Sequence, residues 1–82
     1  MDRFEQCVRG LLALAPTDER DLHLRVDALV DPYLAGFGAQ TAAARRRLAD
    51  AFLAKAPVTT ARERIRARIM REDHKGGPLS LR

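Results

Sequence analysis

The sequence predicts an all-α fold: a small four-helix domain, as a helical bundle or orthogonal helices, with a short flexible C-terminal tail. Alanine and leucine dominate the chain, and apolar residues recur three and four positions apart. No stretch alternates polar and apolar residues with the period of a strand. Prolines and glycines separate four helical segments, so we expect one helical domain over residues 1–76 and a tail over 77–82.

The first predicted helix runs from about Arg3 to Ala15, with Asp2 as its N-cap and Pro16 at its end. Its core face follows the three-four spacing of an amphipathic helix. That face consists of Phe4, Cys7, Val8, Leu11, Leu12 and Ala15.

The second predicted helix begins after Thr17, the expected N-cap, and acidic residues follow at the positive end of the helix dipole. It has the most regular apolar stripe in the chain, formed by Leu22, Val26, Leu29, Val30 and Tyr33. Pro32 removes one backbone donor. We expect a kink or an in-line restart there, and a new cap at Asp31 is the alternative.

The third predicted helix covers about Gln40 to Ala56, turns Leu48, Phe52 and Leu53 inward, and ends at Pro57. The fourth begins at Thr60, where Thr60 and Glu63 match a capping box. Its apolar stripe is thin and comprises Ala61, Ile65 and Ile69. We expect it to end at Gly76-Gly77-Pro78.

A chain of 82 residues buries a marginal core and often needs a staple, a metal or a partner subunit. The single Cys7 cannot form an intrachain disulfide, and no cysteine and histidine residues have the spacing of zinc ligands. We therefore expect a homo-oligomer or a hetero-complex. Residues 1–41 carry four arginines and seven acidic residues, a net −3, whereas residues 42–82 carry a net +7. The two halves either neutralise each other or leave the basic half facing a polyanion.

Several function classes are not expected. No run of about 18 apolar residues indicates a membrane span, and the first residues lack a signal-peptide pattern, so we expect a cytoplasmic protein. No catalytic constellation, phosphate-binding glycine loop or metal motif is present. We therefore expect a non-enzymatic protein with no cofactor, no metal and no small-molecule substrate.

The main candidate site is a row of basic residues on the fourth helix. Helical geometry places Arg64, Arg68, Arg71 and Lys75 in one row, with Ile65 and Ile69 beside it and Arg62 and Arg66 beyond. Like charges four residues apart destabilise a helix by about 0.2–0.5 kcal/mol per pair. This helix therefore needs an acidic surface to face or a strong apolar anchor.

Nucleic-acid binding through phosphate contacts is the first hypothesis, with Arg45, Arg46 and Arg47 extending the basic row. A helix-turn-helix of the third and fourth helices would place this row in a DNA groove, but the connection looks too long and an ordinary helical hairpin is favoured. The structural alternative is a solvated surface, or pairing of the arginines with the acidic half of the chain.

Docking on a larger acidic protein is the second hypothesis. The protein would then be an accessory subunit or inhibitor, with Ile65, Ile69 and Met70 as anchors inside an arginine rim. A third alternative is a homodimer whose acidic and basic halves pair across the two-fold axis. The sequence does not decide among the three.

Overall fold

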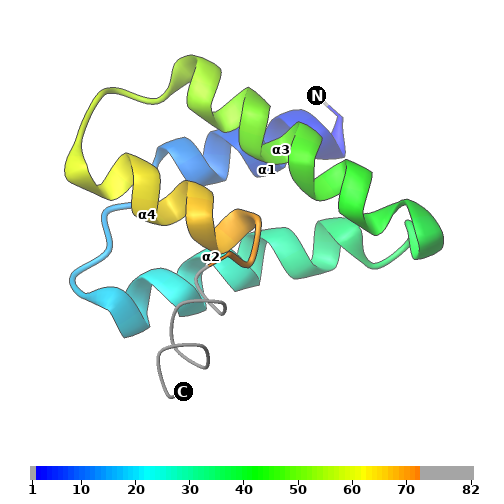
Figure 1. The fold of residues 1–82 in the computed structure, drawn as a ribbon, viewed down its shortest axis with the longest axis horizontal. Coiled ribbons are helices and arrows are strands. Elements are labelled where there is room, and N and C mark those ends of the chain that lie inside the picture. Colours follow the sequence, from blue (N-terminus) through cyan, green and yellow to red (C-terminus); the bar gives the residue numbers. More distant parts are fainter. Residues whose placement is uncertain (1, 73–82) are drawn as a thin grey trace.

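The computed structural model describes residues 2–72 and confirms the all-α prediction for that range. The described residues form α1 (Arg3–Leu12), α2 (Glu19–Leu34), α3 (Thr41–Lys55) and α4 (Thr60–Ile69), with a short 3₁₀ turn, η1 (Gly38–Gln40), before α3 (Figure 1). No strand occurs among them. Lys75 and the expected tail, 77–82, lie outside the described residues.

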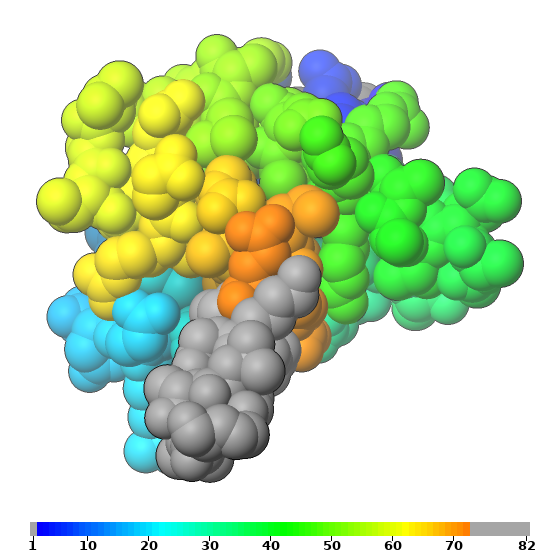
Figure 2. All heavy atoms as spheres, in the orientation of Figure 1, coloured from blue at the N-terminus to red at the C-terminus, as the bar shows by residue number. Residues whose placement is uncertain are grey.

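The four helices pack as a closed ring around one core. α1 contacts α2 and α3, and α4 contacts the same two helices from the other side. In the space-filling view, α4, drawn in yellow to orange, lies between α2 in cyan and α3 in green (Figure 2). The α1–α3 pair and the α2–α4 pair therefore form opposite sides of the bundle.

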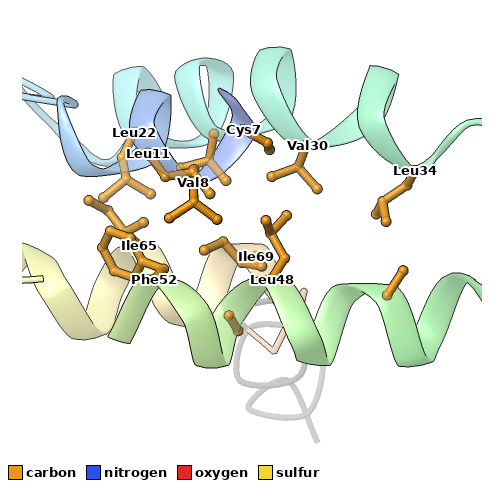
Figure 3. Close-up of a cluster of buried hydrophobic side chains, with 13 residues drawn as sticks. Cys7, Val8, Leu11, Leu22, Val30, Leu34, Leu48, Phe52, Ile65 and Ile69 are labelled. Atoms are coloured by element: carbon orange, nitrogen blue, oxygen red, sulfur yellow. The ribbon is translucent and has the colours of Figure 1, made fainter. Parts of the chain in front are cut away.

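Each helix contributes to the core along the stripe that its apolar spacing predicts (Figure 3). Leu11, Leu22, Leu48 and Ile69 are each 0% exposed. α1 and α2 approach closely at Gly10, where an added Cβ would lie 2.9 Å from Cδ2 of Leu29. The buried core comprises Cys7, Val8, Leu11, Leu22, Val26, Val30, Leu34, Ala44, Leu48, Ala49, Phe52, Ile65 and Ile69.

The predicted starts of α1 and α2 differ in outcome. Asp2 caps α1 as expected, because its side chain accepts a hydrogen bond from the Glu5 amide at 2.8 Å. The α2 cap is Asp18 and not Thr17. The Asp18 carboxylate accepts from the Asp21 amide at 2.8 Å, and the Thr17 amide instead donates to the Asp21 side chain at 2.9 Å.

The ends of these helices also differ from the prediction. α1 stops at Leu12 rather than Ala15. Ala13 forms a tightened final turn, and Pro16 disfavours helical geometry at the residue before it, Ala15. α2 continues through Pro32 to Leu34 as one helix, so the expected in-line continuation is observed and a new cap at Asp31 is not. α3 agrees with the prediction to within one residue at each end.

α4 shows the largest differences. Its N-cap is Thr59, which makes no side-chain cap hydrogen bond, so the predicted capping box at Thr60 is wrong. Glu63 instead accepts a hydrogen bond from Arg66 at 3.0 Å.

The helix ends at Ile69, well before the predicted glycines, because Arg71 adopts a left-handed conformation with φ of 61°. The Arg71 amide donates to the Arg68 carbonyl and the Glu72 amide to the Ala67 carbonyl. These two bonds form the Schellman pattern that closes a helix.

Candidate binding surface

The predicted arginine row lies against the acidic side of α2. Arg64 donates two hydrogen bonds to the Glu19 carboxylate. One turn further along α4, Arg68 pairs with Asp27. Both conditions that the row imposes, an acidic surface to face and an apolar anchor, are therefore met inside the chain.

We call the ion-paired contact between α2 and α4 the α2–α4 seam, and the Arg68–Asp27 pair is its most buried part. Arg68 is 8% exposed, and its Nε lies 2.9 Å from Oδ1 of Asp27 while Nη2 contacts Oδ2 at 2.5 Å. Two parallel bonds of this kind are the strong, geometrically specific form of the arginine–carboxylate pair. Burial alone would raise the pKa of Asp27, but the hydrogen bond from Arg68 and the charges of Arg68 and Arg71 outweigh it. The pKa of Asp27 therefore lies below its ordinary value.

Arginines also organise the C-terminal end of α4. Nη2 of Arg71 lies 3.1 Å from Oδ1 of Asp31 and 3.7 Å from Oδ1 of Asp27. Arg45 reaches over from α3 and donates to the Ile69 carbonyl at 3.1 Å, at the negative end of the α4 dipole. Burial and the neighbouring charge of Arg71 lower the pKa of Arg45.

The remaining α4 arginines also contact protein atoms. Arg62 donates to the Leu53 carbonyl at 3.3 Å, while its Nε is buried without a hydrogen-bond partner among the described residues. Arg66 lies between Glu63 and Glu72, at 3.0 Å from each, and the hydrogen bonds that it donates to Glu72 and Glu63 raise its pKa. All the predicted arginines of α4 are thus engaged within the fold.

The residues proposed as anchors are placed differently. Ile65 is 4% exposed and Ile69 is 0% exposed, so both belong to the core of the folded domain and present no surface to a partner. Met70 is half-buried beside Arg46 and Asp50 on α3. A docking edge on α4 built from the two isoleucines would require α4 to leave the bundle.

The two sides of the bundle carry different net charges. α2 and α4, with Asp18, Arg71 and Glu72, hold seven basic and seven acidic residues and are neutral. α1 and α3, with Asp2, hold six basic and three acidic residues, a net +3. The whole positive excess of residues 2–72 is therefore carried by residues of α1 and α3. Of the predicted site residues among them, Arg47 lies over Phe4 of α1, whereas Arg45 and Arg46 lie toward the end of α4.

A groove of about 330 Å³ runs between α1 and α3 on this side, and we call it the α1–α3 groove. Its floor is apolar and consists of Phe4, Val8, Leu12, Ala51 and Ala54. Its rim carries Glu5, Arg9 and Lys55. Arg9 and Lys55 are exposed and have no ion-pair partner within residues 2–72. The groove is therefore an apolar surface bordered mainly by available positive charge.

A cluster of aromatic rings adjoins the groove at Phe4. The guanidinium carbon of Arg47 lies 4.6 Å from the centre of the Phe4 ring, within the range of a cation–π contact. Tyr33 lies between Phe4 and Phe37, with ring centroids 6.1 and 5.2 Å away. Arg46 forms a long, exposed pair with Asp50, at 3.7 Å. Of the three consecutive arginines of α3, Arg47 is the one that borders the groove floor.

The sequence prediction did not identify Arg9, Lys55 or the groove floor. Arg9 and Lys55 each flank the apolar stripe of their own helix, which is a recognisable signal for residues at the edge of a surface. The two residues border one groove only because α1 and α3 pack side by side, and the sequence pattern does not show which helices are neighbours. Conversely, the structure turns the predicted reading face of a helix-turn-helix, on α4, toward α2.

Other chemistry is sparse in the part of the chain that the structure describes. No group of three or more His, Cys, Asp or Glu side chains within residues 2–72 is arranged to hold a metal ion. Cys7 is buried, and burial raises the pKa of its thiol to about 11. No helix in the same range combines the length and apolar character that crossing a membrane requires.

Comparison with protein-family models, with curated proteins and with solved structures returned no match.

Proposed function

We propose that the protein is a non-enzymatic, cytoplasmic binding module that docks through its α1–α3 side on an acidic surface of a larger protein, as an accessory subunit or inhibitor. The distribution of charge supports this proposal. Arg64, Arg68 and Arg71 are matched by acids of α2, whereas the net +3 of the described residues is carried by α1 and α3. Unmatched charge of one sign favours a partner of the opposite sign.

The surface beside this charge favours a protein over a nucleic acid. Non-specific nucleic-acid binding relies on many phosphate contacts and on ring faces that stack on bases. Here the groove floor is mostly aliphatic, and its single ring, Phe4, already has Arg47 over one face. An apolar floor inside a charged edge has the arrangement of a protein interface, in which a polar rim surrounds an apolar centre.

The test is capture of partners by the tagged chain from its own host, with and without nuclease. The decisive variant reverses two groove charges, Arg9→Glu with Lys55→Glu. A control with the same change of net charge, Arg20→Glu with Arg25→Glu, lies on α2, where Arg25 also loses its pair with Asp21 at 2.9 Å. Circular dichroism would verify that both variants keep the helical fold.

We expect one stoichiometric protein that survives nuclease and is lost from the groove variant only. Recovery of nuclease-sensitive nucleic acid in its place would contradict the proposal and favour the phosphate-binding alternative. A partner that both variants release equally would show a response to net charge rather than to the α1–α3 side.

A further inference from the structure

We propose that the α1–α3 groove is the docking site itself, and that its occupant is an amphipathic helix of the partner protein, apolar on one face and flanked by acidic residues. This inference rests on the proposed function, and it names the surface and the shape and charge of the segment that binds there.

The floor of the groove is about two helical turns long. Phe4, Val8 and Leu12 succeed one another four residues apart on α1, which forms a ridge about 12 Å long. On the opposite wall, the floor residues of α3 are Ala51 and Ala54, whose small side chains leave room for another backbone. Ridges of four-residue spacing pack into the grooves of a neighbouring helix, so apolar residues at i, i+4 and i+7 of a partner helix match this floor.

The rim defines the charge of the occupant. Arg9 borders the groove from α1 and Lys55 from α3, so the two cations stand on both walls. Arg47 adds a third positive charge beside Phe4, and Glu5 is the one acid among the groove residues within the described range. A helix seated on the floor would bring its flanks against these cations, and acidic flanks would be attracted on both sides.

A second copy of the chain is a poor occupant. In a two-fold dimer, the same surface of both copies would meet, which would bring two sides of net +3 together. The acidic helix of another copy, α2, already has Glu19, Asp27 and Asp31 paired with arginines of α4. The segment that fits the groove therefore comes from a different protein.

Fluorescence anisotropy with a designed peptide tests this proposal. The probe is an amidated, fluorescein-labelled helical peptide of about 18 residues, long enough for about five turns, with a leucine stripe and glutamates on both flanks. One control peptide keeps the glutamates and replaces the leucines by glutamine. A second keeps the leucines and replaces the glutamates by lysine.

The protein variants place a charge in the groove or away from it. Ala54→Glu introduces a carboxylate at the floor, and Ala42→Glu introduces the same carboxylate at another exposed position of α3. Both substitutions replace an exposed helical alanine, so we expect both proteins to fold. The experiment uses the full 82-residue chain.

We expect the probe to bind with a dissociation constant of about 100 μM or tighter, and neither control peptide to approach that affinity. Ala54→Glu should weaken binding about tenfold or more, whereas Ala42→Glu should change it less than about twofold. Addition of salt should weaken binding without abolishing it, because the leucine stripe is insensitive to screening.

Several results would overturn the inference. Absence of saturable binding, or equal binding of the leucine-free or lysine peptide, would show that the groove does not select an acidic amphipathic helix. Displacement of the probe by a 20-nucleotide single strand would favour nucleic acid as the occupant, and a dimer in sedimentation that Ala54→Glu disrupts would favour a second copy of the chain. A natural partner that Ala54→Glu retains but the Arg9→Glu, Lys55→Glu variant loses would leave the proposed function standing and refute the groove. Failure to capture any partner would refute the function instead.

Discussion

Removal of the Asp27 carboxylate should destabilise the domain far more than removal of an exposed one. In Asp27→Ala, the guanidinium of Arg68, whose side chain is 9% exposed, would lose the carboxylate that it binds through two bonds. Breaking a buried pair from one side costs about 3–5 kcal/mol. The 27% exposure of Asp27 and the helix propensity of alanine reduce this cost, so we expect about 2–4 kcal/mol.

Thermal and urea unfolding followed by circular dichroism would measure this effect. For a domain of this size, the expected loss corresponds to a fall in Tm of roughly 10–25 °C. Asp50→Ala is the matched control, because its partner Arg46 is 73% exposed and the two groups are 3.7 Å apart. The control should lose less than about 1 kcal/mol.

The two partners of the buried pair should also differ from each other. Arg68→Met leaves Asp27 with access to water, so it should cost less than Asp27→Ala, and the double variant Asp27→Leu with Arg68→Met should recover most of the loss. If Asp27→Ala proves no more harmful than Asp50→Ala, the seam between α2 and α4 contributes no more than an ordinary surface pair, and the assignment of α4 to this position fails.

Three further predictions concern helix ends and pH. The Arg71→Gly protein should be more stable than the Arg71→Ala protein by about 1 kcal/mol in thermal unfolding. Both variants lose the guanidinium, and only glycine tolerates the φ of 61° without cost. Equal stability would mean that the left-handed turn is absent. Asp18→Ala should cost about 1 kcal/mol and Thr60→Ala less than about 0.5, since only Asp18 has a side-chain cap bond; a larger loss at Thr60 would restore the capping box. The folded pKa of Asp27 lies below the unfolded value of about 3.9, so the stabilisation by this carboxylate is complete above pH 3.9 and is lost as the pH falls through the folded pKa. The urea concentration at the midpoint of unfolding should therefore decrease when the pH is lowered below about 4. In Asp27→Ala this decrease should be smaller.

The sequence predicts the helices and the core well, because both depend on short-range spacing. The three-four periodicity places Leu11, Leu22 and Leu48 on inward faces, and all three are fully buried. It also places Ile65 and Ile69 on one thin stripe, and both are buried in the core beside the ion pairs that join α4 to α2.

The sequence does not predict features that depend on which helices are neighbours. No glycine marks the end of α4 at Ile69. The left-handed residue there is Arg71, which contacts Asp27 and Asp31 of α2, and those contacts depend on α2 and α4 being neighbours. The candidate groove has the same origin. Neither Arg9 nor Lys55 indicates a binding surface until α1 and α3 lie side by side.

The seam between α2 and α4 also has a consequence for how the chain folds as it is made. Its pairs join residues 40 to 45 positions apart, so the acids of α2 leave the ribosome long before their arginine partners. Helices of 10 to 16 residues are marginal in isolation, and the core lacks Ile65 and Ile69 until the last helix arrives. We therefore expect nascent chains that stop before Thr60 to remain sensitive to protease, and protection to appear in one step once Arg71 has emerged.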